Sequence, residues 1–121
     1  MESNQKIKNI IEALGQHQDE EAIMVLEKIG TNSDNDEIRE LTAKALVQKN
    51  TEESLRIVLI SRGKGINDLS ARVAMSTINE LVSLKDKDKA VKILDDTIDM
   101  HSEEDIRETA RSVRTLLTFS C

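Results

Sequence analysis

The sequence contains no proline, tryptophan or tyrosine, and Phe119 is its one phenylalanine. Proline breaks or kinks a helix interior, so its absence leaves every amphipathic stretch free to be helical. Without aromatic rings the chain lacks a platform on which nucleobases stack, and its net charge of −6 opposes contact with a phosphate backbone. We therefore expect no nucleic-acid partner.

Cysteine and long apolar runs are also scarce. Cys121 is the single cysteine, so no internal disulfide can form and a reducing compartment is expected. No apolar run approaches the ~20 residues needed to cross a bilayer, and the opening residues, MESNQKIKNI, lack the apolar stretch of a secretory signal. Hydrophobic residues make up 38% and charged residues 33%. This balance predicts one soluble helical domain, residues 1–121, located in the cytoplasm and without a membrane partner.

What the sequence does contain is repetition. One seven-residue phrase occurs three times, as EEAIMVL at 20–26, EESLRIV at 52–58 and DKAVKIL at 88–94. A second pattern lies between the copies, and its arginines, Arg39, Arg72 and Arg107, are 33 and 35 residues apart. When these arginines are aligned, apolar positions recur at i, i+3, i+4 and i+7, which is one face of a helix.

The two patterns alternate and predict seven helices. Those carrying the phrase, the A helices, are expected at 19–30, 52–61 and 87–100, and the others, the B helices, at 4–15, 35–49, 68–84 and 103–118. A repeat of two helices every 31 to 35 residues is typical of a solenoid. We therefore expect an all-α, right-handed α-solenoid of about three and a half helical hairpins. The alignment places these residues in its core: Ile11, Leu26, Leu41, Val58, Ile78, Leu94 and Val113.

The B-helix pattern resembles HEAT-like repeats, especially the short, proline-poor type of phycobilisome lyase-related proteins. The resemblance is carried by NDEIRELTAKAL at 35–46, DLSARVAMSTI at 68–78 and EEDIRETARSV at 103–113. Thr42, Met75 and Thr109 depart from the family's small residues, and Ala71 stands where Val or Ile is expected. The resemblance implies that the arginines form a structural ladder between repeats and that the B helices line a concave face.

Residues capable of chemistry do not form a recognisable site. His17 and His101 fall in loops at opposite ends of the predicted array, and Cys121 has no evident base beside it. The basic loop SRGKG at 61–65 lacks the spacing of a phosphate-binding loop. We therefore expect no enzyme activity, no cofactor and no bound metal.

A stripe of arginines on the last B helix leaves two interpretations open. Arg107, Arg111 and Arg114 share one flank of that helix, where they either meet an acidic partner or are neutralised by neighbouring glutamates.

A partner-binding surface is the remaining candidate. On the B helices, the face opposite the core stripe carries apolar residues in the middle and charged residues around them. The predicted partner-binding residues are Glu40, Ala43, Val47, Leu69, Val73, Ser76, Glu80, Glu108 and Arg111. Either this strip is an open groove, or neighbouring B helices bury it. We expect a non-enzymatic module that binds a partner peptide or helix there; the alternative is an accessory or chaperone-like subunit of a modifying enzyme.

The C-terminal residues TLLTFSC are unusually apolar for the end of a helical array. Leu116 and Leu117 extend the core stripe and should pack inward. Phe119 is expected either to fold back as a cap over the last hairpin or to meet a second copy of the protein. One Phe side chain is too little to hold a dimer, so the cap and a monomer are favoured.

Overall fold

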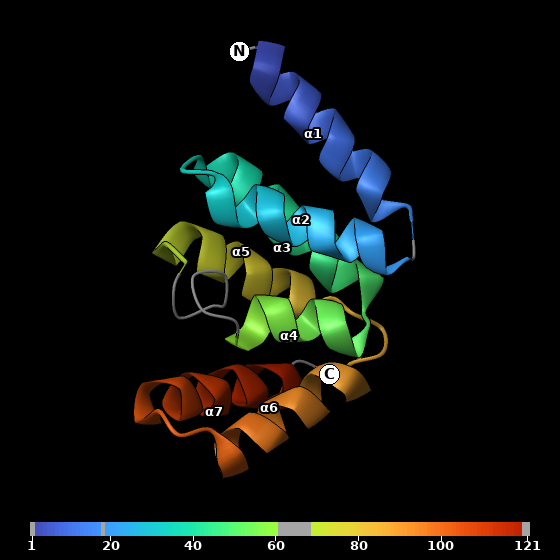
Figure 1. The fold of residues 1–121 in the computed structure, drawn as a ribbon. Helices are drawn as coiled ribbons and strands as arrows, with labels where there is room; N and C mark the ends of the chain where they lie inside the picture. The colour runs from blue at the N-terminus through green and yellow to red at the C-terminus, as the bar shows by residue number, and fades with distance from the viewer. Residues whose placement is uncertain (1, 18, 61–68, 120–121) are drawn as a thin grey trace.

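The computed structural model describes residues 2–17, 19–60 and 69–119, which form seven α-helices and contain no strand (Figure 1). The predicted helices are all present, with ends that differ from the expected ones by up to three residues. Leu55–Ile60, an apolar run that could also read as a strand, is helical. The helices are α1 Glu2–Gly15, α2 Glu20–Asn32, α3 Asp36–Lys49, α4 Glu52–Ile60, α5 Ala71–Val82, α6 Asp88–Met100 and α7 Glu104–Phe119.

Polar side chains in the connections define several helix starts. The Asp19 carboxylate accepts the backbone N–H of Ala22 at 2.9 Å, and the Asn35 side chain accepts those of Glu37 and Ile38. The Ser70 hydroxyl accepts the N–H of Val73 at 3.4 Å. These bonds satisfy donors that an isolated helix end leaves without a partner, so each helix begins directly after its cap.

The helices pack in two rows. The odd-numbered helices pack in order, α1 against α3, α3 against α5 and α5 against α7, while α2 packs against α4 and α4 against α6. Within each row the helices run in the same direction, and the two rows run in opposite directions (Figure 1). Because α3 contacts α1, α2, α4 and α5, it is buried on most of its circumference.

The predicted core is largely confirmed. Ile11, Leu26, Val58, Leu94 and Val113 are all buried. Leu41 and Ile78 are only partly buried, although both pack against the core cluster. Three threonines also reach the interior, Thr42, Thr77 and Thr97, and each hydroxyl donates to the backbone carbonyl four residues earlier in its own helix. That bond removes the cost of burying a hydroxyl without a partner.

The buried face of α5 is rotated from the predicted one. Alignment on the arginines predicts that Ala74, Met75 and Ile78 face the core; Ala74 and Ile78 are partly buried, but Met75 is 58% exposed, and Val73, Thr77 and Leu81 are buried instead. The reason is the position of the cap. Val73 follows Ser70 by three residues, as Ile38 follows Asn35, so these two residues are equivalent. Arg72 therefore lies two positions out of register with Arg39, and aligning the arginines rotated the predicted helix face.

The C-terminal cap is also wrong. The α7 helix continues through Phe119, whose side chain is 85% exposed and covers nothing. Leu117 is buried as expected, but Leu116 is 47% exposed. A helix places adjacent residues about 100° apart, so only one of the two leucines can face the core. Cys121 lies outside the described residues.

Candidate functional site

An apolar groove lies between α1 and α2. The α1 helix meets α2 near the connection at 16–19 and diverges from it toward the N-terminus (Figure 1). The divergence opens a groove with a volume of about 650 Å³. We call it the α1–α2 groove; its lining residues are Ile7, Ile10, Lys28, Ile29, Asn32, Ser33, Asp34, Asn35 and Ile38.

The floor and walls of the groove are aliphatic. Ile38 is fully buried at the base, Ile7 and Ile29 are partly buried, and Ile10 is 50% exposed. On α2, Val25 lies one turn before Ile29 on the same helix face, and it is 41% exposed. An apolar stripe of α2 therefore extends from the groove toward the start of the helix.

The repeated phrase provides an internal standard for this stripe. Its sixth position is occupied by Val25 in α2, Ile57 in α4 and Ile93 in α6. Val25 is 41% exposed, whereas Ile57 is 8% and Ile93 2% exposed. The difference has a simple packing cause, because α4 and α6 each follow another helix of their row, and no described helix precedes α2 in it.

The fifth position of the phrase differs in chemistry as well. Arg56 in α4 and Lys92 in α6 are exposed cations, but the corresponding residue of α2 is Met24, which is 51% exposed. In α2, therefore, the exposed positions five and six of the phrase are both apolar. Comparing the three copies position by position could have revealed this from the sequence, but the groove itself depends on the tilt of α1.

Lys49 joins α3 to the end of α1, a role that the sequence did not predict. It is 7% exposed at the end of α3, and its Nζ donates to the backbone carbonyls of Leu14, at 2.9 Å, and His17. A cation at a helix C-terminus stabilises the carbonyls that the helix leaves unpaired. Burial lowers the pKa of the Lys49 ammonium group, and the negative charge of Asp19 acts in the opposite direction.

A second polar contact holds α1 farther along its length. Lys8 Nζ lies 2.6 Å from Glu37 Oε1, in the first turn of α3. The hydrogen bond from Lys8, together with its charge, holds the pKa of the Glu37 carboxyl below its usual value. Lys8 and Lys49 thus tie α1 to the two ends of α3, and together with the packing of α1 on α3 they hold α1 in the tilt that leaves the groove open.

The repeated arginines have structural roles. Arg39 Nε donates to the Gly30 carbonyl at 3.4 Å, and Arg107 Nη1 donates to the His101 carbonyl at 3.2 Å. Each joins an odd-numbered helix to the end of the helix before it, where a cation is favourable. Arg72 differs, because it lies 3.5 Å from Glu40 of α3 instead.

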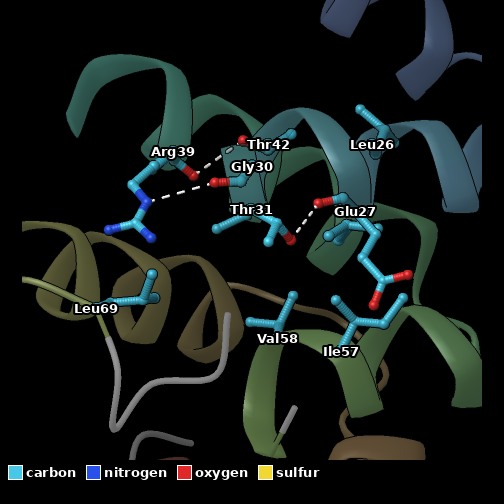
Figure 2. A pocket seen from close by; sticks show the side chains of 11 residues that line it. Leu26, Glu27, Gly30, Thr31, Arg39, Thr42, Ile57, Val58 and Leu69 are labelled. Carbon is cyan, nitrogen blue, oxygen red and sulfur yellow. Dashed lines mark hydrogen bonds between the residues drawn. The ribbon is translucent and has the colours of Figure 1, made fainter. Parts of the chain in front are cut away.

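A small cavity of about 30 Å³ lies where α2, α3 and α4 meet, beside Leu69 (Figure 2). Ile57 and Val58 line the cavity from α4, and Leu26 and Gly30 line it from α2. The hydroxyls of Thr31 and Thr42 are bonded to carbonyls of their own helices. The cavity has the volume of about one water molecule, so it is a packing defect rather than a ligand site.

The predicted apolar strip on the B helices is not on the surface. Ala43, Val47 and Val73 are 7%, 0% and 0% exposed, since α3 and α5 pack together over them, and Leu69 lines the small cavity. The polar members stay at least partly accessible: Glu40 lies within 4 Å of Lys44 and Arg72, Ser76 and Glu80 are half-buried, and Glu108 and Arg111 are exposed. The strip could have been an open groove or a contact between neighbouring B helices, and these apolar residues form a contact between helices.

The remaining candidates are also placed. Arg107 and Arg111 both bind Glu104, the latter at 3.2 Å, and Arg114 pairs with Asp95, so the arginine stripe is balanced by carboxylates. His101 Nδ1 accepts the backbone N–H of Glu103 at 3.1 Å. The loop at 61–65 lies outside the described residues.

Within 2–17, 19–60 and 69–119, no three His, Cys, Asp or Glu side chains are placed to hold a metal ion. None of the helices in these ranges is long and apolar enough to cross a membrane. Comparison of the chain with family models, with curated proteins and with solved structures gave no match.

Proposed function

We propose that this protein is a non-enzymatic module that binds another protein in the α1–α2 groove, and that its two helix rows form a HEAT-like solenoid. The solenoid is supported by the packing order within the rows and by the repeated phrase. The binding role rests on one observation: Val25 is 41% exposed, whereas Ile57 and Ile93, at the same position of the phrase, are buried in helices that each follow another helix of the row.

A protein ligand fits the groove better than a metabolite does. Metabolite sites are concave and converge several polar groups on one ligand. The α1–α2 groove is open, and four of its nine lining residues are isoleucines. Its polar lining residues are Lys28, Asn32, Ser33, Asp34 and Asn35, of which Asn35 already caps α3. An apolar stripe with a polar rim is the usual character of a protein-binding surface.

The test is a titration with purified partners. Affinity purification on the wild-type protein supplies candidates, and each purified candidate is then titrated calorimetrically against wild type and Ile10→Asp. We expect the change at Ile10 to weaken a true partner at least ~10-fold, because a charge is placed against the partner's apolar surface. Met100→Asp, at a 75% exposed side chain on α6, is the matched control and should leave affinity unchanged. Partners that bind the Ile10 variant as tightly as wild type would refute the groove as the site.

A further inference from the structure

In the row of α2, α4 and α6, the apolar face of one helix is covered by the neighbouring helix. The face of α4 that contains Ile57 is covered by α2, a helix lying along it in the same direction (Figures 1 and 2). In α6, which packs against α4, Ile93 is likewise buried. The equivalent face of α2 contains Val25 and continues into the α1–α2 groove.

We propose that the α1–α2 groove takes a single amphipathic helix of a partner protein, lying along α2 and parallel to it, as α2 lies along α4. This inference rests on the proposed binding function and specifies its ligand. Binding of an amphipathic helix in an apolar groove is a common mode of recognition, in which anchors one turn apart provide the contact.

The internal α2–α4 interface indicates which side chains the helix needs. Leu26 and Gly30 of α2 line one small cavity together with Ile57 and Val58 of α4 (Figure 2). Gly30 lies closest to Thr42 of α3, so the requirement taken from the α2–α4 interface is aliphatic. The partner helix should therefore carry a branched aliphatic residue at the position equivalent to Leu26.

The charges of the groove favour one direction of binding. Lys28 lies within α2, and Asp34 lies beyond its C-terminal end. A helix parallel to α2 would match them with a carboxylate near its middle and a cation near its C-terminus. A cation at that end also complements the helix dipole of the partner. An antiparallel helix would need the opposite order, with its cation near the N-terminus, where the dipole disfavours it.

A second copy of this chain fits the groove less well. To continue the row, it would present the side of α6 opposite Ile93, where Asp95 pairs with Arg114 of α7. Burying these charges against Val25 and Ile29 would cost more than the apolar contact returns. The occupant that matches the groove is therefore a helix from a different protein.

The probe is an acetylated and amidated peptide with the sequence of α2, Glu20–Asn32, because this helix already packs in the proposed manner on α4. It is titrated into the ¹⁵N-labelled full-length protein and followed by amide shifts. An isolated helix of this length is marginal in water, so we expect a dissociation constant on the order of 0.1–1 mM. Shifts should be concentrated at Ile7, Ile10, Val25 and Ile29.

Two variants and a spin label make the outcome decisive. Val25→Asp should weaken the peptide at least ~10-fold, whereas Met100→Asp should not, and a peptide carrying Leu26→Asp should fail to bind. A spin label at the peptide's C-terminus should broaden the amides near Asp34. Broadening near Asp19 instead would refute parallel binding, and absence of groove shifts up to ~2 mM would refute the helix-binding role.

The outcomes separate this inference from the proposed function. A purified partner that depends on Ile10 but contributes no helix to the groove would keep the function and overturn the inference. Parallel peptide binding without any partner that depends on Ile10 would support the inference and remove the function. Sedimentation of the protein alone as a dimer that Val25→Asp dissociates would overturn the inference in favour of a second copy.

Discussion

The two ends of the helix stack expose apolar side chains in different ways. At the N-terminal end, Ile7, Ile10 and Ile29 meet in one groove, and the exposed Val25 extends their stripe. At the C-terminal end, Leu116 and Phe119 are exposed on α7, a helix whose arginines pair with Glu104 and Asp95. Scattered apolar residues on a surface are common, whereas a continuous apolar groove indicates a binding surface. Similar side chains therefore acquire different roles according to what the neighbouring helix covers.

The middle of the stack provides the reference for both ends. Val58, in α4, is 1% exposed, so Val58→Asp places a charge without a partner in the core. We expect a loss of about 3–5 kcal/mol in the free energy of unfolding, or failure to fold. Glu80→Ala, at a half-buried carboxylate on α5, should change it by less than ~1 kcal/mol. Urea unfolding followed by circular dichroism measures both, and equal midpoints would contradict the assigned core.

The next largest effect concerns the seat of α2 at the N-terminal end. A Cβ added at Gly30 would lie 3.2 Å from Thr42 Oγ1 and 3.4 Å from Thr42 Cβ. Gly30→Leu should therefore push α2 away from α3 and cost about 1–3 kcal/mol. Gly15→Ala is the control, since its Cβ would meet Ala45 at an ordinary 3.7 Å. If thermal unfolding shows Gly30→Leu to be neutral, the close approach of α2 to α3 is not present in solution.

Lys49 helps to hold α1 in the tilt that opens the groove at the N-terminal end. Lys49→Met removes the donor to the Leu14 and His17 carbonyls, and we expect a loss of about 1–2 kcal/mol. Hydrogen exchange should accelerate in α1 and leave α6 and α7 unchanged. Uniform acceleration through all seven helices would mean that α1 has no independent anchor.

The same substitution gives a signed pH dependence. Burial lowers the pKa of Lys49 below that of the unfolded chain, ~10.4, so the unfolded state binds more protons just below that pH. Wild type should therefore gain stability relative to Lys49→Met as the pH rises toward ~10.4. If the difference in the free energy of unfolding between wild type and Lys49→Met moved in the opposite direction, the Lys49 ammonium group would not be buried.

The smallest effect is expected at the Lys8–Glu37 pair. The folded pKa of Glu37 is lowered by Lys8, so the pair stabilises the protein above the unfolded pKa of ~4.3. This contribution is lost as the pH falls through the folded pKa. Glu37→Gln should thus be less stable than wild type at pH 7, and the difference in the free energy of unfolding should shrink as the pH falls below ~4.3. Glu53→Gln, at an exposed carboxylate of α4, is the control, and an equal pH response there would show that the ion pair contributes nothing.

Much of the fold could be predicted, because helix periodicity is a local property of the sequence. The phrase at 20–26 and its copies located α2, α4 and α6, and they placed Leu26, Val58 and Leu94 in the core. The face of α5 was missed because alignment on Arg72 ignored the cap at Ser70, which sets where the helix begins.

The site was less predictable, because it depends on how helices cover one another. Val47 and Val73 have an apolar pattern that fits an exposed strip or a helix contact equally well, and only the packing of α3 on α5 decides between them. The α1–α2 groove depends on the tilt of α1, which Lys49 and Lys8 help to hold through contacts with residues about 30 positions away in sequence.

One set of three matched substitutions tests the central claim, that the outer face of α2 is open where its counterparts are covered. Val25→Asp, Ile57→Asp and Ile93→Asp place the same charge at the same position of the phrase, and urea unfolding gives the free energy of each. Val25→Asp should cost less than about 1 kcal/mol, while the other two should each cost several kcal/mol. If Val25→Asp were as destabilising as Ile57→Asp, the face would already be covered in the protein, and the groove could not be its binding site.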